Sequence, residues 1–274
     1  YMITTDCYYG PSQRPKKTCQ DYTICGYSPS PYTIVCDGCS SSKDTDFGAR
    51  ILASLSKQHL KSLFAKLEKG TFDLPYLCDW FGWSVTYKSR NIINDMGLPT
   101  TCMDSTLIVS FVWNKSIITF MYGDGCVYSV SKSGEVKGQR ISYAGSAPFY
   151  LSYQLDSERE KEYRKFVASV PEGKLVKSLT VNGKETKLEW DKPALFTFEE
   201  DQHSLVLITT DGSESFINFD NMDRVDITNQ LTSIKSKHGE FIKRRSIRMI
   251  EDLSKLNTYN VDDFSVGAIL IDGD

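Results

Sequence analysis

The stretch YTIVCDGCSSSKDTDFGARILASL, residues 32–55, runs from an apolar strand pattern through Asp37-Gly38 into a serine-rich turn and then a helix. Asp37 therefore stands at the end of a segment that is apolar enough to be buried. An ionised carboxylate near a core is costly unless it is paired, hydrogen-bonded or bound to a metal. The positions of the other carboxylates in the chain indicate which of these explanations applies.

The composition, with 40% hydrophobic and 24% charged residues, is typical of a soluble globular protein. No linker-like stretch divides the 274 residues, so we expect one domain over residues 1–274. The net charge of −3 argues against nucleic-acid binding, and we expect the short basic run KRRSIR, residues 243–248, on the solvated face of a helix. The eight cysteines show no disulfide spacing, and there is no apolar run of about 18 residues. These features predict a cytoplasmic protein with reduced thiols and no membrane contact.

Short segments rich in β-branched and aromatic residues dominate the chain and are separated by Gly, Asn, Asp or Ser turns, which favours antiparallel pairing through hairpins. The predicted strands are residues 22–27, 32–36, 105–113, 116–123, 126–131, 194–199, 204–210 and 264–271. Helical periodicity appears in residues 47–70, 157–167 and 226–256. Asp46 is the predicted N-cap of the first helix and Gly70 its stop, whereas residues 74–98 give no clear signal. These elements predict two antiparallel sheets with helices outside.

Acidic residues stand at the ends of five of the predicted strands. Three of them directly follow an apolar strand and precede a glycine, which is more often only a turn signal when it occurs once. Strand ends from distant parts of the chain meet at one rim of a sheet sandwich, where clustered carboxylates repel one another unless cations hold them together. Oxygen-only ligands favour Mg²⁺ or Mn²⁺ over Zn²⁺. The positions are Asp21, Asp37, Asp124, Asp211 and Asp262.

The ordered set QDYTICGY, YTIVCDG, DSTLIVSFVWNKSIITFMYGDGCVYSVSKSGEV, LVLITTDG and VDDFSVGAIL resembles the type 2C metal-dependent protein phosphatases in motif order and spacing. The resemblance covers nearly the whole chain. It implies an α+β fold, a four-layer α-β-β-α sandwich of two central antiparallel sheets flanked by helices. It also implies hydrolysis of phosphoserine or phosphothreonine in proteins by a water activated between two ions of Mg²⁺ or Mn²⁺, opposing a Ser/Thr kinase, without a covalent enzyme intermediate.

The resemblance further implies roles for individual residues. Asp37 would bridge both ions, helped by the Gly38 carbonyl, and Asp37 and Asp211 would be the central catalytic carboxylates. Asp211 and Asp262 would complete one metal site and Asp21 would serve the other, while Asp124 with Asp211 matches the place of a third ion. Lys16 stands where the family usually has an arginine for the phosphate. A flap-like insertion is expected at about residues 138–170, in a protein that we expect to be a monomer.

Three departures from the family pattern leave alternatives open. Lys16 offers a point charge in place of a planar guanidinium, so the role could pass to Arg14 or Lys17. Gln20 replaces the glutamate often found before the first Asp, and the turn after Gly38 begins with Cys39. One alternative is therefore a weak or inactive phosphatase-like module that binds phosphoproteins or regulates a partner, and another is an enzyme for small phosphomonoesters.

Other constellations carry less weight. Cys36 and Cys39 have a zinc-like spacing but no second pair of cysteines at partner spacing, so a zinc site is not expected. The histidines His59, His203 and His238 lie in no nucleophile motif, which argues against a triad hydrolase. The flap aromatics, of which Tyr143 and Phe149 are examples, are expected to pack the flap more than to grip a substrate.

Overall fold

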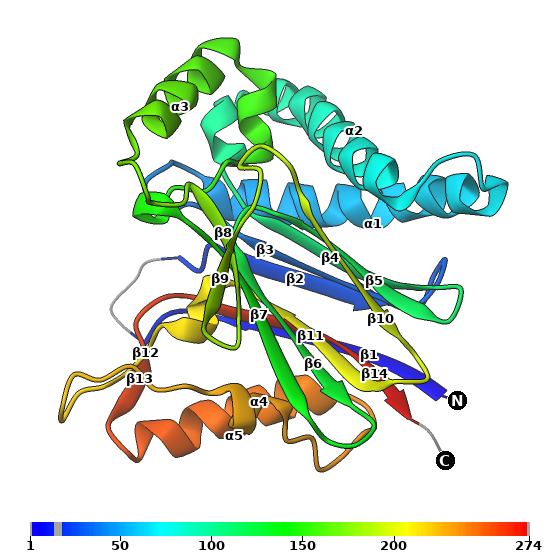
Figure 1. The fold of residues 1–274 in the computed structure, drawn as a ribbon, viewed down its shortest axis with the longest axis vertical. Helices are drawn as coiled ribbons and strands as arrows, with labels where there is room; N and C mark the ends of the chain where they lie inside the picture. Colours follow the sequence, from blue (N-terminus) through cyan, green and yellow to red (C-terminus); the bar gives the residue numbers. More distant parts are fainter. Residues whose placement is uncertain (1, 14–17, 273–274) are drawn as a thin grey trace.

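The structure is a computed structural model that describes residues 2–13 and 18–272. Two antiparallel sheets pack face to face, with helices on both outer faces (Figure 1). The seven-stranded sheet has the order β1-β14-β11-β6-β7-β8-β9 and the five-stranded sheet the order β10-β5-β4-β3-β2. A two-stranded ribbon, β12-β13, stands beside them. The predicted α-β-β-α sandwich is confirmed.

The strands of the large sheet are β1 (Met2–Gly10), β6 (Gly125–Ser131), β7 (Val136–Tyr143), β8 (Lys177–Val181), β9 (Lys184–Lys187), β11 (His203–Thr209) and β14 (Phe264–Asp272). Those of the five-stranded sheet are β2 (Asp21–Gly26), β3 (Tyr32–Asp37), β4 (Leu107–Trp113), β5 (Ser116–Tyr122) and β10 (Ala194–Glu199). The ribbon is β12 (Phe216–Asn218) and β13 (Thr258–Asn260). All eight predicted strands are present, but β1, β7, β8, β9, β12 and β13 had no sequence prediction.

The α-helices are α1 (Thr45–Lys69), α2 (Leu74–Asp95), α3 (Ser157–Ser169), α4 (Thr228–Thr232) and α5 (Phe241–Ser254). Short 3₁₀ helices are η1 (Thr100–Met103), η2 (Ala144–Ser146), η3 (Leu151–Leu155) and η4 (Asp211–Glu214). The stretch that gave no clear signal is α2, which begins at the N-cap Asp73, whose carboxylate accepts the Tyr76 N–H. None of the described helices combines the length and the apolar composition needed to cross a bilayer.

The start of α1 corrects one prediction. The N-cap position is occupied by Asp44, whose backbone is left-handed, and not by Asp46. Asp46 lies in the first helical turn, where a carboxylate still interacts favourably with the positive end of the helix dipole. Gly70 ends the helix as predicted, with φ 63° and an N–H that bonds to the Leu67 carbonyl.

Three clusters of buried apolar residues fill the three interfaces between the four layers of the sandwich. Helices α1 and α2 pack on the five-stranded sheet through a cluster that includes Leu52, Phe81 and Phe120. The two sheets meet through residues such as Val35 and Ile208. Helices α4 and α5 cover the outer face of the seven-stranded sheet through a third cluster. The strand ends therefore stay fixed relative to one another.

Candidate metal centre

The predicted carboxylates come from both sheets. Asp21 begins β2 and Asp37 ends β3, and the two residues are directly opposite in the antiparallel pair. Asp211 opens η4 immediately after β11 in the other sheet. Asp124 lies in the turn that joins β5 of one sheet to β6 of the other. The rim where the two sheets meet therefore carries carboxylates from four chain segments.

The pKa values show that these carboxyls act on one another. Burial raises the pKa of Asp37 well above its usual value, and the charges of Asp21, Asp211 and Asp124 raise it further. Burial is also the main cause that raises the pKa of Asp21 and of Asp124 to about 7. The pKa of Asp211 is raised by burial and then by Asp262. All five predicted carboxylates thus belong to one electrostatic cluster, which protons or cations would relieve.

Few hydrogen bonds compensate the buried carboxyl of Asp21. One of its oxygens, Oδ2, accepts the Thr210 hydroxyl at 2.9 Å. The other oxygen, Oδ1, is buried and has no hydrogen-bond partner among the described residues. A buried oxygen without a partner costs free energy comparable to a lost hydrogen bond, so this position calls for a cationic or protic neighbour.

The donor set of the cluster suits a hard cation, because every candidate side-chain ligand is a carboxylate. Within residues 2–13 and 18–272, however, no three His, Cys, Asp or Glu side chains surround one point closely enough to form a ready metal site. Mg²⁺ is usually held by one or two carboxylates and keeps several waters, so it does not need three such side chains. The residues therefore fit hydrated Mg²⁺ or Mn²⁺ better than a fully protein-ligated ion.

The three Asp-Gly pairs share a structural reason for their glycines. A Cβ on Gly38 would lie 2.8 Å from the Thr45 carbonyl oxygen, and one on Gly125 would lie 2.6 Å from that of Thr209. A Cβ on Gly212 would lie only 1.8 Å from the Asp263 carbonyl oxygen. Each glycine therefore lets backbone pack tightly beside a carboxylate, which independent surface turns would not require.

The turn after Asp37 is held by Gln20. The Gly38 N–H donates to the Gln20 carbonyl at 3.2 Å. The Gln20 side-chain amide donates to the Thr45 hydroxyl at 2.7 Å and to the Cys39 carbonyl at 3.3 Å. Gln20 therefore fixes the turn through its NH₂ group, a role that a glutamate could not fill in the same way.

Sequence reasoning assigned no role to Asp104, which joins the same turn to the predicted flap. Asp104 is buried and accepts the Ser42 hydroxyl at 2.7 Å and the Ser152 hydroxyl at 2.6 Å. The guanidinium of Arg159, on α3, donates to both Asp104 oxygens at 2.9 and 2.8 Å. Asp104 also accepts the Cys39 N–H through its backbone carbonyl. Nothing in the sequence pattern distinguishes this residue, because its partners come from distant segments.

Asp263 is a second residue to which sequence reasoning assigned no role, although the pair Asp262-Asp263 opens the last predicted strand. Its carboxylate is buried and accepts the backbone N–H of Ser12 and of Gln20, both at 2.8 Å. These two N–H groups stand on either side of residues 14–17. The predicted phosphate ligand Lys16 and its alternatives Arg14 and Lys17 lie outside the described residues. Asp263 therefore anchors both ends of the segment that carries them.

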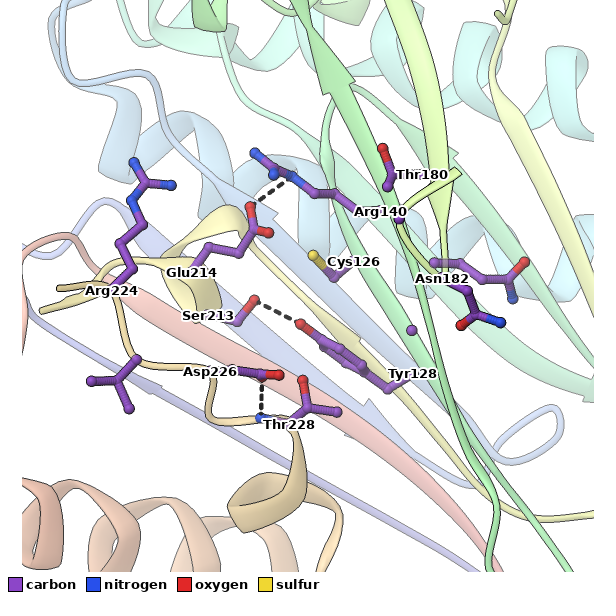
Figure 2. Close-up of a pocket in the computed structure, with 14 residues that line it drawn as sticks. Cys126, Tyr128, Arg140, Thr180, Asn182, Ser213, Glu214, Arg224, Asp226 and Thr228 are labelled. Atoms are coloured by element: carbon purple, nitrogen blue, oxygen red, sulfur yellow. Dashed lines mark hydrogen bonds and ion pairs between the residues drawn. The ribbon is translucent and has the colours of Figure 1, made fainter. Parts of the chain in front are cut away.

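A cavity of about 510 Å³ is lined by residues of β6, β7 and η4, and none of the five predicted carboxylates lines it (Figure 2). Arg140 projects from β7 toward η4 and pairs with Glu214 at 2.7 Å. The positive charge of Arg140 also lowers the pKa of both Asp124 and Asp211, which places the pair beside the cluster. Arg224 lies on the other side of Glu214. The cavity is large enough for a peptide side chain or a small ligand.

The predicted flap region, residues 138–170, contains the end of β7, then η2, η3 and α3. Tyr143 and Phe149 are buried in the cluster between the sheets, and Phe149 packs edge-on against Tyr163 and Trp190. These aromatics therefore pack the segment onto the sandwich, as expected. The Arg159–Asp104 contact adds a polar connection to the turn after Asp37.

The cysteines and histidines noted in the sequence do not form a functional site within the part of the chain that the structure describes. All eight cysteines are free thiols, and Cys36 is buried. The rings of His59 and His203 contact the backbone carbonyls of Leu55 and Glu199, in each case four residues earlier in the chain. Among the described residues, no three His, Cys, Asp or Glu side chains are grouped closely enough to form a structural zinc site.

Comparisons with known proteins agree with this fold. Residues 10–245 match the sequence model of the protein phosphatase 2C family. A crystal structure of a bacterial serine phosphatase has a TM-score of 0.59 at 14% identity, covering 100% of this chain and 99% of that one. Serine-threonine phosphatase 2C from Toxoplasma gondii has a TM-score of 0.58 at 12% identity, covering 98% and 95%. The catalytic domain of PstP, solved with two manganese ions, has a TM-score of 0.52 at 13% identity, covering 98% and 97%. No curated protein matches the sequence.

Proposed function

The chain belongs to the protein phosphatase 2C family, and on this premise we propose that it is a metal-dependent phosphatase acting on phosphoserine and phosphothreonine in proteins. The observation that carries the proposal is the cluster of Asp21, Asp37, Asp124 and Asp211 at the rim where the two sheets meet. Burial raises the pKa of these carboxyls, and neighbouring carboxylates raise it further in Asp37, Asp124 and Asp211, which is the arrangement expected of groups that share cations.

The residues would hold Mg²⁺ or Mn²⁺ in the order that the family pattern implies. Asp37 would contact two ions with help from the Gly38 carbonyl, Asp211 and Asp262 would serve one of them, and Asp21 the other. Asp124 with Asp211 would hold a third. When bound, such ions lower the pKa of a shared water and neutralise the phosphoryl oxygens. Asp263 and Gln20 position the segments around the cluster through the contacts described above.

The cavity beside the cluster supports a protein substrate. It brings Arg140, paired with Glu214, and Arg224 together at η4, the helix that Asp211 opens, so residues that flank a phosphoserine would have polar partners there. We propose that Arg224→Gln raises KM for a phosphopeptide and leaves turnover of a small aryl phosphate unchanged, with Arg90→Gln on α2 as the matched control. An equal effect on both substrates would argue for a small-phosphomonoester enzyme instead.

The test of the main proposal is phosphate release from a phosphothreonine peptide with Mn²⁺, with Mg²⁺ and with EDTA. We expect release only with metal, and a loss of about a hundredfold or more in Asp37→Asn and in Asp211→Asn, as when a preorganised stabilising group is removed. Asp201→Asn, an exposed position outside the cluster, should keep full activity. Full activity in both cluster variants would make the mechanism wrong.

The second candidate is a weak or inactive module that binds phosphoproteins. Gln20 favours it, because the Gln20 amide is committed to Thr45 and Cys39 and supplies no charge to the cluster. Calorimetry with millimolar Mn²⁺ separates the two functions: no heat of binding, together with no phosphate release, would favour the module.

The remaining features of the proposal concern the whole protein. We propose a cytoplasmic monomer of one domain that opposes a Ser/Thr kinase, with residues 138–170 as its flap and Lys16 as its phosphate ligand. The eight free thiols support a reducing compartment. The ion pair between Arg159 and Asp104 supports a flap that stays beside the carboxylate cluster.

A further inference from the structure

The short basic run of the sequence forms one wall of a groove between α5 and the segment that follows α4. We call the set Lys235, Arg244, Arg245 and Arg248 the basic groove. The cavity at its centre measures about 80 Å³, and Ser233 and Ser236 also line it. The prediction of a solvated helix face is therefore incomplete, because cationic side chains from two segments meet around one cavity.

The positive charges of the basic groove have little internal compensation. Lys235 and Arg248 make no hydrogen bond or ion pair with any residue that the structure describes. Arg244 donates to the His238 carbonyl at 2.6 Å, and Arg245 donates to the Gln230 carbonyl. Both of these acceptors are neutral. Burial lowers the pKa of Arg245, the charge of Asp252 raises it, and the charge of Arg248 lowers it less strongly.

Two of the acidic residues nearby form ion pairs with lysines outside the basic groove. Glu240 pairs with Lys243 at 2.7 Å, and Asp252 pairs with Lys255 at 2.8 Å. Glu251 lies one turn beyond Arg248 and forms no ion pair with any described residue. The four cations are therefore only partly compensated: Asp252, although paired with Lys255, also attracts Arg245 and Arg248. Like charges gathered in this way repel one another unless an anion joins them.

The groove has the chemistry of a phosphate site. Three of its cations are guanidiniums, whose planar forks match phosphate oxygens bidentately, and its two serines offer hydroxyl donors. The cavity volume of about 80 Å³ is larger than the volume that two water molecules occupy in liquid water, about 30 Å³ each. From these observations, we propose that the basic groove binds a ligand with several phosphate groups, either free or as a lipid headgroup.

This site is independent of the carboxylate cluster and of the proposed phosphatase activity. Helix α5 lies on the outer face of the seven-stranded sheet, where the Asp6 carboxylate of β1 accepts the N–H groups of Ile242 and Lys243 (Figure 1). None of the four groove residues is among the main causes that shift the pKa of Asp21, Asp37, Asp124 or Asp211. Ligand binding at the groove can therefore be measured with the metal centre disabled.

The experiment is calorimetric titration of the full chain with inorganic tripolyphosphate in EDTA. We expect saturable binding that weakens about tenfold or more in Lys235→Gln/Arg248→Gln, because charge-assisted contacts are lost. The control Lys88→Gln/Arg90→Gln removes the same charge from exposed positions on α2 and should bind like wild type. Arg244→Gln provides a second variant, and thermal melting checks that each protein is folded.

Two further arms identify the source of the phosphate groups. Co-sedimentation with phosphatidylcholine vesicles containing a phosphoinositide, but not with phosphatidylcholine alone, would identify a lipid headgroup if it is lost in Lys235→Gln/Arg248→Gln. Tripolyphosphate binding without vesicle binding would identify a free ligand. Absence of both in the wild type, or equal binding by the groove and control variants, would overturn the proposal.

Discussion

Asp21 and Asp37 stand directly opposite each other where the paired strands β2 and β3 meet the rim of the sandwich. Like charges at directly opposite positions of an antiparallel pair are destabilising. Here both carboxyls are also drawn away from water, and the pKa of each is raised. The pair therefore weakens the metal-free protein, and any cation that joins the two carboxylates removes the penalty.

The first prediction concerns stability and metal. We expect Mn²⁺ to raise the Tm of the wild type by several degrees, since ligand at a hundred times Kd adds about 2.7 kcal/mol. In Asp37→Asn the metal-free Tm should be higher than that of the wild type, because the repulsion is gone, and Mn²⁺ should have little effect. Scanning calorimetry with Asp201→Asn as control measures both quantities. A lower metal-free Tm in Asp37→Asn would contradict this account.

The second prediction concerns Asp263. Removing its carboxylate in Asp263→Ala leaves the buried N–H groups of Ser12 and Gln20 without their acceptor. We expect a loss of about 3 kcal/mol in the free energy of unfolding, from two charge-assisted hydrogen bonds. Urea unfolding measures it against Asp226→Ala, where one exposed hydrogen bond to the Thr228 N–H is lost and the cost should stay near 1 kcal/mol. Equal losses in the two variants would show that the Asp263 carboxylate stabilises the fold no more than an exposed hydrogen bond does.

The third prediction concerns the pair of Arg159 and Asp104. Their side chains are 20% and 3% exposed, so Arg159→Met leaves a buried carboxylate with only hydroxyl partners. We expect it to cost about 3 kcal/mol, as for a broken buried ion pair. Adding Asp104→Asn should recover part of this loss, because the uncompensated charge is removed. A double-mutant cycle by urea unfolding tests the coupling, and strictly additive losses would exclude it.

The fourth prediction concerns Lys177, which should make the free energy of unfolding depend on pH. Burial lowers the pKa of Lys177 to about 8, and its ammonium group donates to the Lys192 carbonyl. The folded state therefore binds this proton less tightly than the unfolded state, whose value is 10.5. The free energy of unfolding should rise as pH increases from about 8 to 10.5, the interval in which the unfolded chain alone retains the proton.

The magnitude follows from the same values. Between pH 7.5 and 9.5 the wild type should gain about 2 kcal/mol of stability relative to Lys177→Met, at 1.36 kcal/mol for each pH unit of differential protonation. Denaturant unfolding of both proteins at the two pH values gives their free energies of unfolding. Subtracting the values for Lys177→Met removes the pH dependence that all other groups contribute. A difference that does not change with pH would mean that Lys177 titrates alike in both states.

The sequence predicted the parts of this protein that depend on local pattern. Residues 32–36 and 264–271 are largely apolar runs, and both lie in central strands. Strand β1 escaped prediction because MITTDCYYG alternates poorly, and β9 because all four of its residues are exposed. For the site, Asp-Gly pairs after strands gave a local signal, whereas Asp104 and Asp263 gave none. Their roles depend on partners between 48 and 251 residues away, such as Ser152 and Ser12.

The position of Asp124 in the β5–β6 turn has a mechanical consequence. That turn is where the chain leaves the five-stranded sheet and enters the seven-stranded one. Asp37 ends a strand of the first sheet, and Asp211 follows a strand of the second. A cation held between Asp37 and Asp211 would crosslink the two layers at this edge and resist sliding of one layer over the other. Loss of the ion would then soften the whole sandwich against shear, well beyond the residues that touch it.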